Sequence, residues 1–313
     1  MKTVLTKSAT TAAEFIKQNG LVAFPTETVY GLGADVFNET AVAKIFAAKG
    51  RPSDNPLIAH VADETQIKLL VSRIADSAEK FIAALFPGPL TLVLPKSANV
   101  PLTATAGLET IGVRMPRHAL AAEFLRACAI PLVAPSANLS GKPSPTTWAA
   151  VYEDLNTRID CILQGEQTNF GLESTVVDCT GETPLILRAG AVTLEQLQSV
   201  VPKTEFAATD AREIKRSPGT RYKHYAPAAN VVLVDSPNEI IKSENAAFIG
   251  LDAPTQEFQR QMICRDAEEY AHALFAFFRE CDARGIKTIY CQKVVNTGVG
   301  LAVNDRLKRA AAN

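Results

Sequence analysis

The run L-V-A-F-P-T-E-T-V-Y-G-L-G occupies residues 21–33 and joins an apolar segment to a polar one. Its first four residues predict a short buried strand, which Pro25 ends. The remainder, 25–33, predicts a loop that combines hydroxyls with glycines, and glycines let a backbone approach a ligand closely. Because open α/β sheets bind ligands beside the carboxyl ends of their strands, this loop is a candidate binding segment. A tight turn with internally satisfied side chains fits the same residues.

Short strands and helices alternate on both sides of this run. Further strands are predicted at 57–61, 90–94, 111–115, 132–134, 161–163, 174–179 and 185–187. Helices are predicted from a capping box at Thr11–Glu14 to Gly20, from Asn38 to Lys49 with Gly50 after it, from Asp76 to about 85, and over 118–128, 146–154 and 193–200. This alternation indicates the α/β class, and the crowded strands favour a large mixed sheet over a purely parallel one.

The pattern pauses near residue 203 and restarts near residue 230. At roughly 100–200 residues per domain, a chain of 313 residues suggests two domains, 1–203 and a smaller α/β, Rossmann-like 230–313. In the second, strands are predicted at 231–234, 246–251 and 288–291, with helices near 266–283 and 300–311. The segment between them, 204–229, contains S-P-G-T-R-Y-K-H-Y-A-P at 217–227. Ordinary linkers are rich in Gly and Ser or in charge, so this aromatic and cationic segment is interpreted either as one that lies on a surface or as a lid that closes over a pocket.

Charge and cysteine usage exclude several classes of protein. The 32 basic and 33 acidic residues leave a net charge of -1, so there is no broad basic field for a nucleic-acid backbone or an anionic membrane. The six cysteines form no C-x-x-C pair and no zinc spacing, which favours buried reduced thiols. No signal peptide and no apolar run of about 20 residues is present, so we expect a soluble, cytoplasmic chain. The P-loop, dinucleotide, G-x-S-x-G and H-E-x-x-H motifs are also absent.

Cations and hydroxyls recur in the loops that follow the predicted strands. Lys49 and Arg51 flank a helix end and fit phosphate binding, although Lys49 equally fits a cation at a helix dipole. Arg114 alternates with apolar neighbours and therefore lies on the opposite strand face, where it is either exposed or a clamp for a carboxylate or phosphate. His60, taken alone, fits a structural role better than a catalytic one. Six such loops in one domain predict a polyanion pocket assembled from the whole sheet.

These segments together resemble the threonylcarbamoyl-AMP synthase family, which has a YrdC-type domain. The resemblance rests on P-T-E-T-V-Y-G-L-G at 25–33, K-x-R at 49–51, D-N-P-L at 54–57, S-x-N at 136–138, E-S-T-V at 173–176 and L-R-A-G at 187–190. It spans roughly residues 8–200, and the run at 217–227 with the added α/β domain resembles the long, two-domain branch. The fold that it implies is a large, twisted, open mixed sheet.

The resemblance implies a reaction in which ATP, L-threonine and bicarbonate give threonylcarbamoyl-AMP and pyrophosphate. A partner complex then transfers the threonylcarbamoyl group to an adenosine beside the tRNA anticodon, and Mg²⁺ accompanies the ATP. Lys49 and Arg51 are the expected catalytic residues. The expected threonine-binding residues are Thr28, His60, Arg114, Ala134 and Ser174. The expected nucleotide-binding residues are Arg51, Asn55, Thr110, Ser136, Asn138, Ser144, Arg188, His224 and Tyr225.

Two other functions fit some of these features. One is a module that binds tRNA or double-stranded RNA without chemistry, but the neutral charge predicts weak or no direct tRNA binding. The other is a carbamoyl-adenylate enzyme of hydrogenase maturation, which the lack of C-x-x-C pairs disfavours. Because no residue stands out as a general base or covalent nucleophile, the expected reaction is a direct in-line attack.

Overall fold

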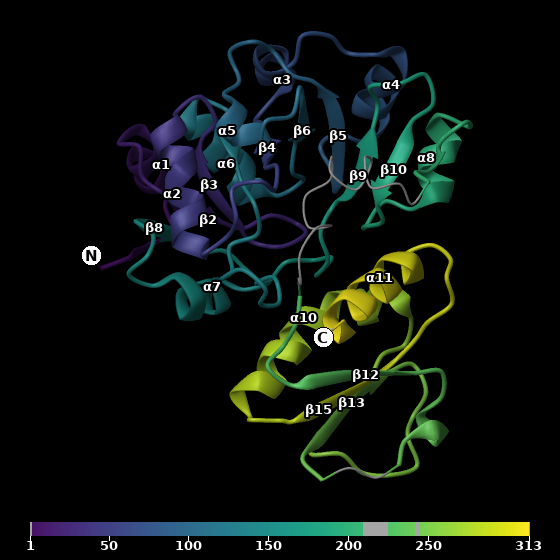
Figure 1. Cartoon of the computed structure of the whole chain (residues 1–313). Coiled ribbons are helices and arrows are strands. Elements are labelled where there is room, and N and C mark those ends of the chain that lie inside the picture. The colour runs from purple at the N-terminus through teal and green to yellow at the C-terminus, as the bar shows by residue number, and fades with distance from the viewer. Residues whose placement is uncertain (1, 209–224, 242–243, 313) are drawn as a thin grey trace.

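The computed structural model describes residues 2–208, 225–241 and 244–312, and its strands form two separate sheets. Figure 1 shows the larger sheet and its helices above a smaller body made from the end of the chain. The lid motif at 217–227 lies outside the described residues except for Tyr225, Ala226 and Pro227.

The larger sheet has 11 strands in the order β1-β8-β2-β3-β7-β4-β6-β5-β9-β10-β11. Their bounds are β1 Val4–Thr6, β2 Val22–Phe24, β3 Gly31–Asp35, β4 Ile58–His60, β5 Leu90–Pro95, β6 Thr110–Arg114, β7 Leu132–Val133, β8 Cys161–Leu163, β9 Thr175–Asp178, β10 Leu185–Arg188 and β11 Glu205–Phe206. The sheet contains both parallel pairs, such as β4 with β6, and antiparallel pairs, such as β5 with β6. The predicted large mixed sheet is therefore confirmed.

Helices cover both faces of this sheet. They are α1 Ala9–Lys17, α2 Glu39–Lys49, α3 Glu64–Leu70, α4 Asp76–Leu85, α5 Leu102–Thr105, α6 Ala119–Cys128, α7 Trp148–Leu155 and α8 Leu194–Val200. Val22 and Phe24 of β2 pack with α1 and α6, whereas Ala23 between them packs into the core on the α2 side. Successive strand residues point to opposite faces, so β2 is apolar throughout because both of its faces are buried.

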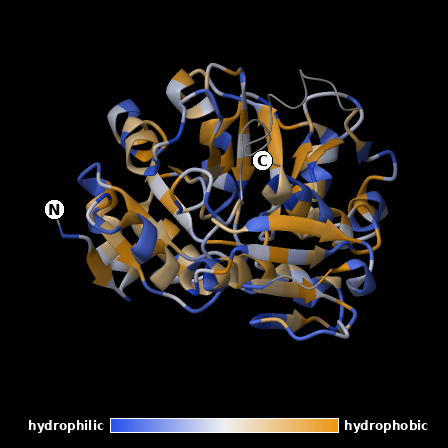
Figure 2. Ribbon diagram, turned by 60° about the horizontal axis from the view of Figure 1, so that its bottom comes forward, coloured by the Kyte–Doolittle hydropathy of each residue, from blue (hydrophilic) through white to orange (hydrophobic). Residues whose placement is uncertain are grey.

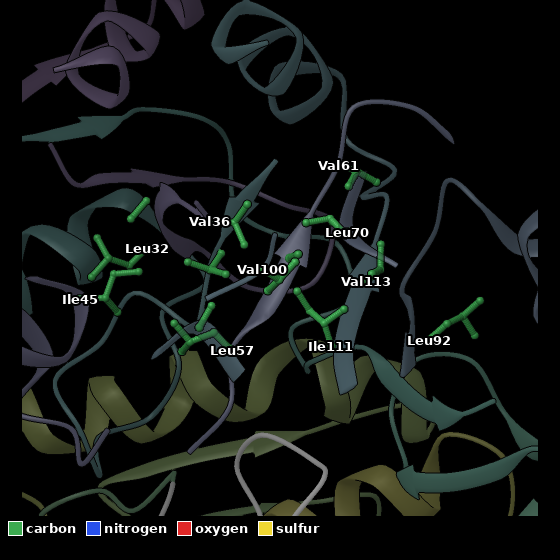
Figure 3. Packing of buried hydrophobic residues seen from close by; sticks show 14 of the residues in the cluster. Leu32, Val36, Ile45, Leu57, Val61, Leu70, Leu92, Val100, Ile111 and Val113 are labelled. Atoms are coloured by element: carbon green, nitrogen blue, oxygen red, sulfur yellow. The ribbon is translucent and has the colours of Figure 1, made fainter. Parts of the chain in front are cut away.

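The core on the α2 side is the larger one. Leu32, Ile45, Leu57 and Val113 are among its members, which come from strands and helices far apart in the sequence (Figure 3). Figure 2 shows that the strands are predominantly hydrophobic. A core of this extent fixes the strand register, because a slip by one residue would turn every buried side chain toward the other face.

The smaller sheet is entirely parallel, with the order β12-β15-β13-β14. Its elements are β12 Asn230–Val234, the short helix η1 Pro237–Glu239, β13 Ala246–Gly250, β14 Arg260–Ile263, α10 Ala267–Ala283, β15 Thr288–Gln292 and α11 Gly300–Ala311. This arrangement confirms the predicted α/β pattern of the second domain. Helices α10 and α11 lie between this sheet and the larger body (Figure 1).

Several local predictions need correction. Helix α1 begins after Ser8, whose side chain caps it, so Thr11 lies within the first turn and does not open a capping box. Residues 31–33, interpreted as part of a loop, belong to β3, which is antiparallel to β2, because Leu32 and Ala34 carry the alternating apolar pattern of a buried strand. The caps of α2 are as predicted, with Asn38 before it and Gly50 after it in the left-handed conformation at φ 61°.

The remaining sequence predictions concern global properties. All six cysteines are buried and free, as expected. No helix in the described parts of the chain is long and apolar enough to cross a membrane. The division at 203 and 230 stays a prediction, and β11 at 205–206 still pairs with β10 of the larger sheet.

Candidate active site

One pocket lies over the larger sheet and brings most of the predicted site residues together. Its lining is Thr28, Val29, Tyr30, Gly31, Arg51, Pro56, Leu57, Ile58, His60, Arg114, Ala134, Pro135, Ser136, Asn138, Glu173, Ser174, Arg188 and Tyr225. We call this the sheet pocket. Three arginines and one carboxylate, Glu173, line it, so cations outnumber anions in the lining, as expected of a binding site for a polyanion.

His60 and Arg114 reach the sheet pocket from within strands rather than from loops. They are register partners on the parallel strands β4 and β6. Their neighbours Ala59 and Val113 point into the larger core, so His60 and Arg114 point to the other face. The predicted alternation around Arg114 is therefore confirmed, and it places the guanidinium in a pocket rather than in solvent.

The Arg114 side chain is 5% exposed and already has protein partners. One nitrogen forms an ion pair with Glu27 at 2.8 Å, and another donates to the Thr28 hydroxyl at 2.8 Å. Thr28 in turn shares a hydrogen bond with Thr26 at 2.9 Å. Glu27 was quoted within the first motif, but sequence reasoning gave it no role. Its carboxylate orients the guanidinium that faces the sheet pocket.

His60 is held as a neutral base. Burial, aided by the charge of Arg114, lowers its pKa to about 3. Its Nδ1 lies 3.3 Å from the Ile58 carbonyl, which can only accept, so Nδ1 carries the proton in this contact and Nε2 is left as an acceptor. The ring also meets Phe24 edge-on at 5.7 Å. A neutral imidazole here can orient a donor without adding charge.

Arg51 contributes a second cation with little protein pairing. Its Nη2 lies 3.4 Å from the carbonyls of Asn55 and Pro56, and its Nε has no hydrogen-bond partner among the described residues. Burial lowers its pKa to about 10. Within the same described residues, both polar atoms of the buried Asn55 side chain also lack a partner. Unsatisfied buried groups cost about 1–3 kcal/mol each, so the 51–55 segment is suited to a polar ligand.

Arg188 supplies the third cation and braces the segment that carries Ser174. It donates from Nε and Nη2 to the Ser174 carbonyl at 3.1 and 2.9 Å, and from Nη2 to the Ser174 hydroxyl at 3.1 Å. Gly190 lets β10 end this close, because an added Cβ would lie 2.3 Å from the Thr175 nitrogen. The L-R-A-G and E-S-T-V motifs are therefore one structural unit.

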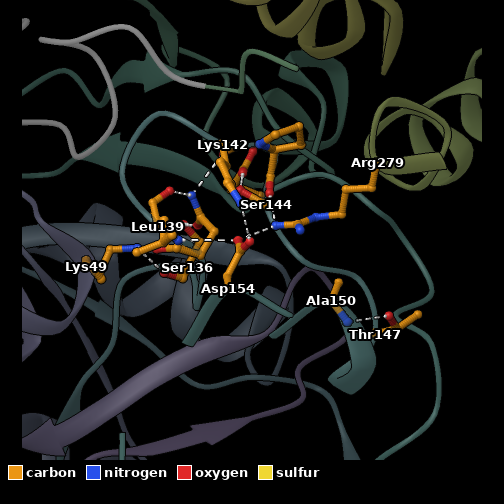
Figure 4. A network of polar contacts seen from close by, with 12 residues as sticks. Lys49, Ser136, Leu139, Lys142, Ser144, Thr147, Ala150, Asp154 and Arg279 are labelled. Carbon is orange, nitrogen blue, oxygen red and sulfur yellow. Dashed lines mark hydrogen bonds and ion pairs between the residues drawn. The ribbon is translucent and has the colours of Figure 1, made fainter. Parts of the chain in front are cut away.

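Lys49 does not line the sheet pocket. Its ammonium is buried and donates to the carbonyls of Ser136 and Asn138 at 2.5 and 2.6 Å (Figure 4). Burial, and then the nearby Arg51, lower its pKa well below the usual value. Ser136 also donates to the Asn138 side chain at 2.6 Å. Lys49 thus braces the S-x-N loop, and its predicted contact with phosphate stays a prediction.

Four other predicted site residues do not line the sheet pocket. Thr110 begins β6 and pairs with Pro95, away from the arginines. Ser144 is buried and donates to Glu173 at 2.6 Å. The Asn55 carbonyl accepts a hydrogen bond from Arg51 at 3.4 Å, and His224 lies outside the described residues.

Tyr225 is the one described residue of the lid motif that reaches the sheet pocket. Its ring stacks on Phe275 of α10 with centroids 5.3 Å apart, and the guanidinium carbon of Arg306 lies 5.3 Å from its centroid. Its φ of 67° is unusual for an aromatic residue. Burial raises its pKa, so it stays a neutral phenol.

Sequence reasoning missed the contribution of the second domain. Arg306 of α11 pairs with Glu173 at 2.8 Å, and Arg279 of α10 pairs with Asp154 of α7 at 2.8 Å. The only sequence signal was Glu173 itself, which stands in the quoted E-S-T-V motif. Within the described ranges, no group of three or more His, Cys, Asp or Glu is arranged to hold a metal.

The chain matches two family models in succession. Residues 14–190 match a Sua5/YciO/YrdC family described as "Telomere recombination", and residues 192–312 match "Threonylcarbamoyl-AMP synthase, C-terminal domain". The threonylcarbamoyl-AMP synthase of Pyrococcus abyssi is 41% identical over 315 residues, covering 96% of this chain and 93% of that one. The enzyme of the same name from Bacillus subtilis is 40% identical over 321 residues, covering 96% and 92%.

Solved structures agree with these matches. The crystal structure of P. abyssi Sua5 complexed with L-threonine has a TM-score of 0.89 at 38% identity, covering 99% of this chain and 97% of that one. Escherichia coli YciO shares the fold of 60% of this chain, with a TM-score of 0.53 at 22% identity. On its motifs, its two sheets and its full-length relatives, this chain belongs to the threonylcarbamoyl-AMP synthase family.

Proposed function

We propose that this chain is an L-threonylcarbamoyladenylate synthase, a nucleotidyltransferase that makes threonylcarbamoyl-AMP and pyrophosphate from ATP, L-threonine and bicarbonate. The observation that carries the proposal is the convergence of Arg51, Arg114 and Arg188 around the neutral His60 in the sheet pocket. Three cations match the triphosphate and the amino-acid carboxylate, which are the two anionic groups that the reaction must bring together.

Threonine binds at the Arg114 end of the sheet pocket. Arg114 pairs with the threonine carboxylate, for which Glu27 holds the guanidinium in place. Thr28 and Ser174 offer hydroxyls, His60 offers an acceptor at Nε2, and Ala134 leaves room because it adds only a methyl group. The P. abyssi protein, which has been solved with L-threonine bound, supports this assignment at the level of the substrate.

ATP binds at the Arg51 end. Arg51 and Arg188 face the phosphates, and Asn55 supports Arg51 through its carbonyl. Ser136 and Asn138 lie in the braced loop beside the phosphates, and Tyr225 covers them. Mg²⁺ would be held mainly by phosphate oxygens of the bound ATP and by water oxygens rather than by protein side chains, and it would supply charge neutralisation there. The two nearby carboxylates, Glu27 and Glu173, are each already paired with an arginine. They therefore do not need to serve as ligands for Mg²⁺.

The reaction requires two anions, the N-carboxylate of threonine and the triphosphate of ATP, to be brought together and aligned. The neutral threonine amine attacks carbon dioxide released from bicarbonate and loses one proton, which leaves an N-carboxylate. An oxygen of that carboxylate attacks the α-phosphorus, the bond to the bridging oxygen of the β-phosphate breaks, and pyrophosphate leaves. Preorganised cations stabilise the charge that develops, and fixed geometry removes the entropic cost of the encounter.

We further propose that the product passes to a tRNA threonylcarbamoyl-transferase complex and that both reactions take place in the cytoplasm. Direct tRNA binding is not required, in keeping with the net charge of -1. The competing interpretation, an RNA-binding module without chemistry, predicts no turnover of small substrates.

The decisive experiment measures pyrophosphate release from ATP without RNA. We expect release that requires L-threonine, bicarbonate and Mg²⁺ together, with threonylcarbamoyl-AMP identified by mass spectrometry. Pyrophosphate release that is indifferent to threonine, or no release at all, would refute the proposal.

A further inference from the structure

The side chain of Arg306 is completely enclosed although it is long and charged. It comes from α11 in the second domain, has 0% exposure, and is the largest of the fully buried side chains in the described parts of the chain. A buried guanidinium requires partners for its N–H groups, since an uncompensated charge in the interior is strongly destabilising. The positions of its partners therefore show what α11 does for the sheet pocket.

All three guanidinium nitrogens of Arg306 donate. Nε donates to Glu173 at 2.8 Å, Nη2 to the Ala189 carbonyl at 3.1 Å, and Nη1 to the neighbouring Asp305 at 2.6 Å. Glu173 directly precedes Ser174, and Ala189 directly follows Arg188. One side chain of the second domain thus joins the two segments that carry these pocket residues.

Glu173 connects Arg306 to Ser144, one of the predicted nucleotide-binding residues. Its second oxygen accepts a hydrogen bond from Ser144 at 2.6 Å. Burial alone would raise the Glu173 pKa, but the charges of Arg306 and Arg188 lower it below its usual value. The carboxylate therefore stays ionised, and charge-assisted hydrogen bonds are shorter and stronger than neutral ones.

Arg306 also contacts the lid residue that reaches the pocket. Its guanidinium carbon lies 5.3 Å from the centroid of the Tyr225 ring, within cation–π range. Phe275 of α10 stacks on the same ring at 5.3 Å. The position of Tyr225 over the sheet pocket is therefore set by two residues of the second domain.

We propose that Arg306 is a positioning residue for the nucleotide half of the sheet pocket, acting through Glu173 on Ser144, through the Ala189 carbonyl on the segment that carries Arg188, and through direct contact on Tyr225. It touches no reacting group. The inference rests on the proposed function, because that function assigns ATP to this half of the pocket. According to this inference, the second domain fixes the positions of the nucleotide-binding side chains.

The test compares the full-length protein with its Arg306→Lys variant. Lysine keeps the charge but offers one compact ammonium, which cannot bond Glu173 and Ala189 and also stack on Tyr225. Calorimetric titration measures the Kd of a non-hydrolysable β,γ-imido ATP analogue with Mg²⁺ and, separately, the Kd of L-threonine. We expect the analogue Kd to rise at least tenfold and the threonine Kd to change less than threefold.

Arg260→Lys is the matched control. Arg260 lies in the same domain, pairs with Glu280 at 2.9 Å and lies 5.4 Å from the Phe277 ring, but it contacts none of the pocket residues. We expect both Kd values to stay unchanged. Equal losses for analogue and threonine in Arg306→Lys, or no loss for either, would show a structural role only and would overturn the inference.

Two further measurements keep the inference testable. If Arg306→Lys does not fold, Glu173→Gln takes its place and is expected to give the same selective rise in analogue Kd. If both variants fold, the double variant is expected to bind the analogue no more weakly than the weaker single one, because both act along one chain of contacts. Additive losses would overturn the proposed route through Glu173.

These outcomes are separable from a failure of the proposed function. A wild-type protein that binds the analogue but releases no pyrophosphate refutes the proposed function, while the binding ratio still decides the role of Arg306. A wild-type protein that does not bind the analogue overturns both, since there is then no nucleotide half to position.

Discussion

Arg279 of α10 lies 2.8 Å from one carboxylate oxygen of Asp154 in α7, and Lys142 lies 2.9 Å from the other. Arg279 also donates to the Pro143 carbonyl at 2.5 Å. The two domains are therefore joined by a carboxylate that is 1% exposed and that also accepts a hydrogen bond from the Leu139 N–H, in the loop that carries Ser136 (Figure 4).

We expect Arg279→Ala to lower the free energy of unfolding by about 1.5–3 kcal/mol, since a hydrogen bond to a buried charged group is lost. Urea unfolding measures this change. The control is Arg284→Ala in the residue that follows α10, whose pair with Glu280 is largely exposed and contributes only about 0–1 kcal/mol. Equal effects of the two substitutions would contradict a special role for the Asp154 contact.

Arg114 decides threonine binding under the proposed function. Arg114→Ala is expected to raise the KM for threonine about tenfold to a hundredfold, which corresponds to about 1.5–3 kcal/mol for a charge-assisted contact. Steady-state kinetics with saturating ATP measure it. Lys80→Ala, which removes an exposed ion pair with Asp76, should leave this KM unchanged. An unchanged KM in Arg114→Ala would show that the threonine carboxylate does not bind at Arg114.

Arg51 acts at the nucleotide end. Arg51→Ala is expected to lower kcat/KM for ATP by about tenfold to a hundredfold, because a charge-assisted hydrogen bond contributes about 1.5–3 kcal/mol. The loss should fall mainly on kcat if Arg51 acts in the transition state. The exposed Arg73 provides the control, and Arg73→Ala should have wild-type kinetics. If Arg51→Ala also had wild-type kinetics, Arg51 would have no role in ATP binding or catalysis.

His60 makes stability depend on pH in a defined direction. Its pKa is lowered from 6.5 to about 3, so between these values the unfolded chain binds a proton that the folded chain does not. Stability is therefore lost as the pH falls through this window. In His60→Gln this loss should shrink by about 2 kcal/mol between about pH 7 and pH 5, as measured by urea unfolding at both pH values. An undiminished loss in the variant would mean that His60 titrates normally.

Gly190 permits the contact between its own segment and residues 173–175. In Gly190→Ala the added carbon would lie 2.3 Å from the Thr175 nitrogen and 2.4 Å from the Ser174 carbonyl carbon, so the backbone must shift. We expect at least a tenfold loss of pyrophosphate release. At Gly181 the nearest atom would be 3.9 Å away, so Gly181→Ala should change stability by less than about 0.5 kcal/mol and keep full activity.

The sequence predicted those parts of the site that depend on local pattern. The alternation around Arg114 and the caps of α2 could be predicted because each is fixed by residues within a few positions. The strand β3 was missed because its glycines were interpreted only as loop residues, although Leu32 and Ala34 alternate with them. The Glu173–Arg306 pair could not be predicted, since it joins residues 133 positions apart and only the packing of α11 on the larger body brings them together.

The pairing of β1 with β8 has a consequence for how the chain is made. Val4 pairs with Cys161, and β2 also pairs with β8, so this edge of the larger sheet is unfinished until residue 163 has been synthesised. Until then the nascent chain presents unpaired backbone edges and apolar side chains, which are the features that promote aggregation and chaperone binding. Production of this protein on the ribosome should therefore be most vulnerable before β8 emerges and safer after it.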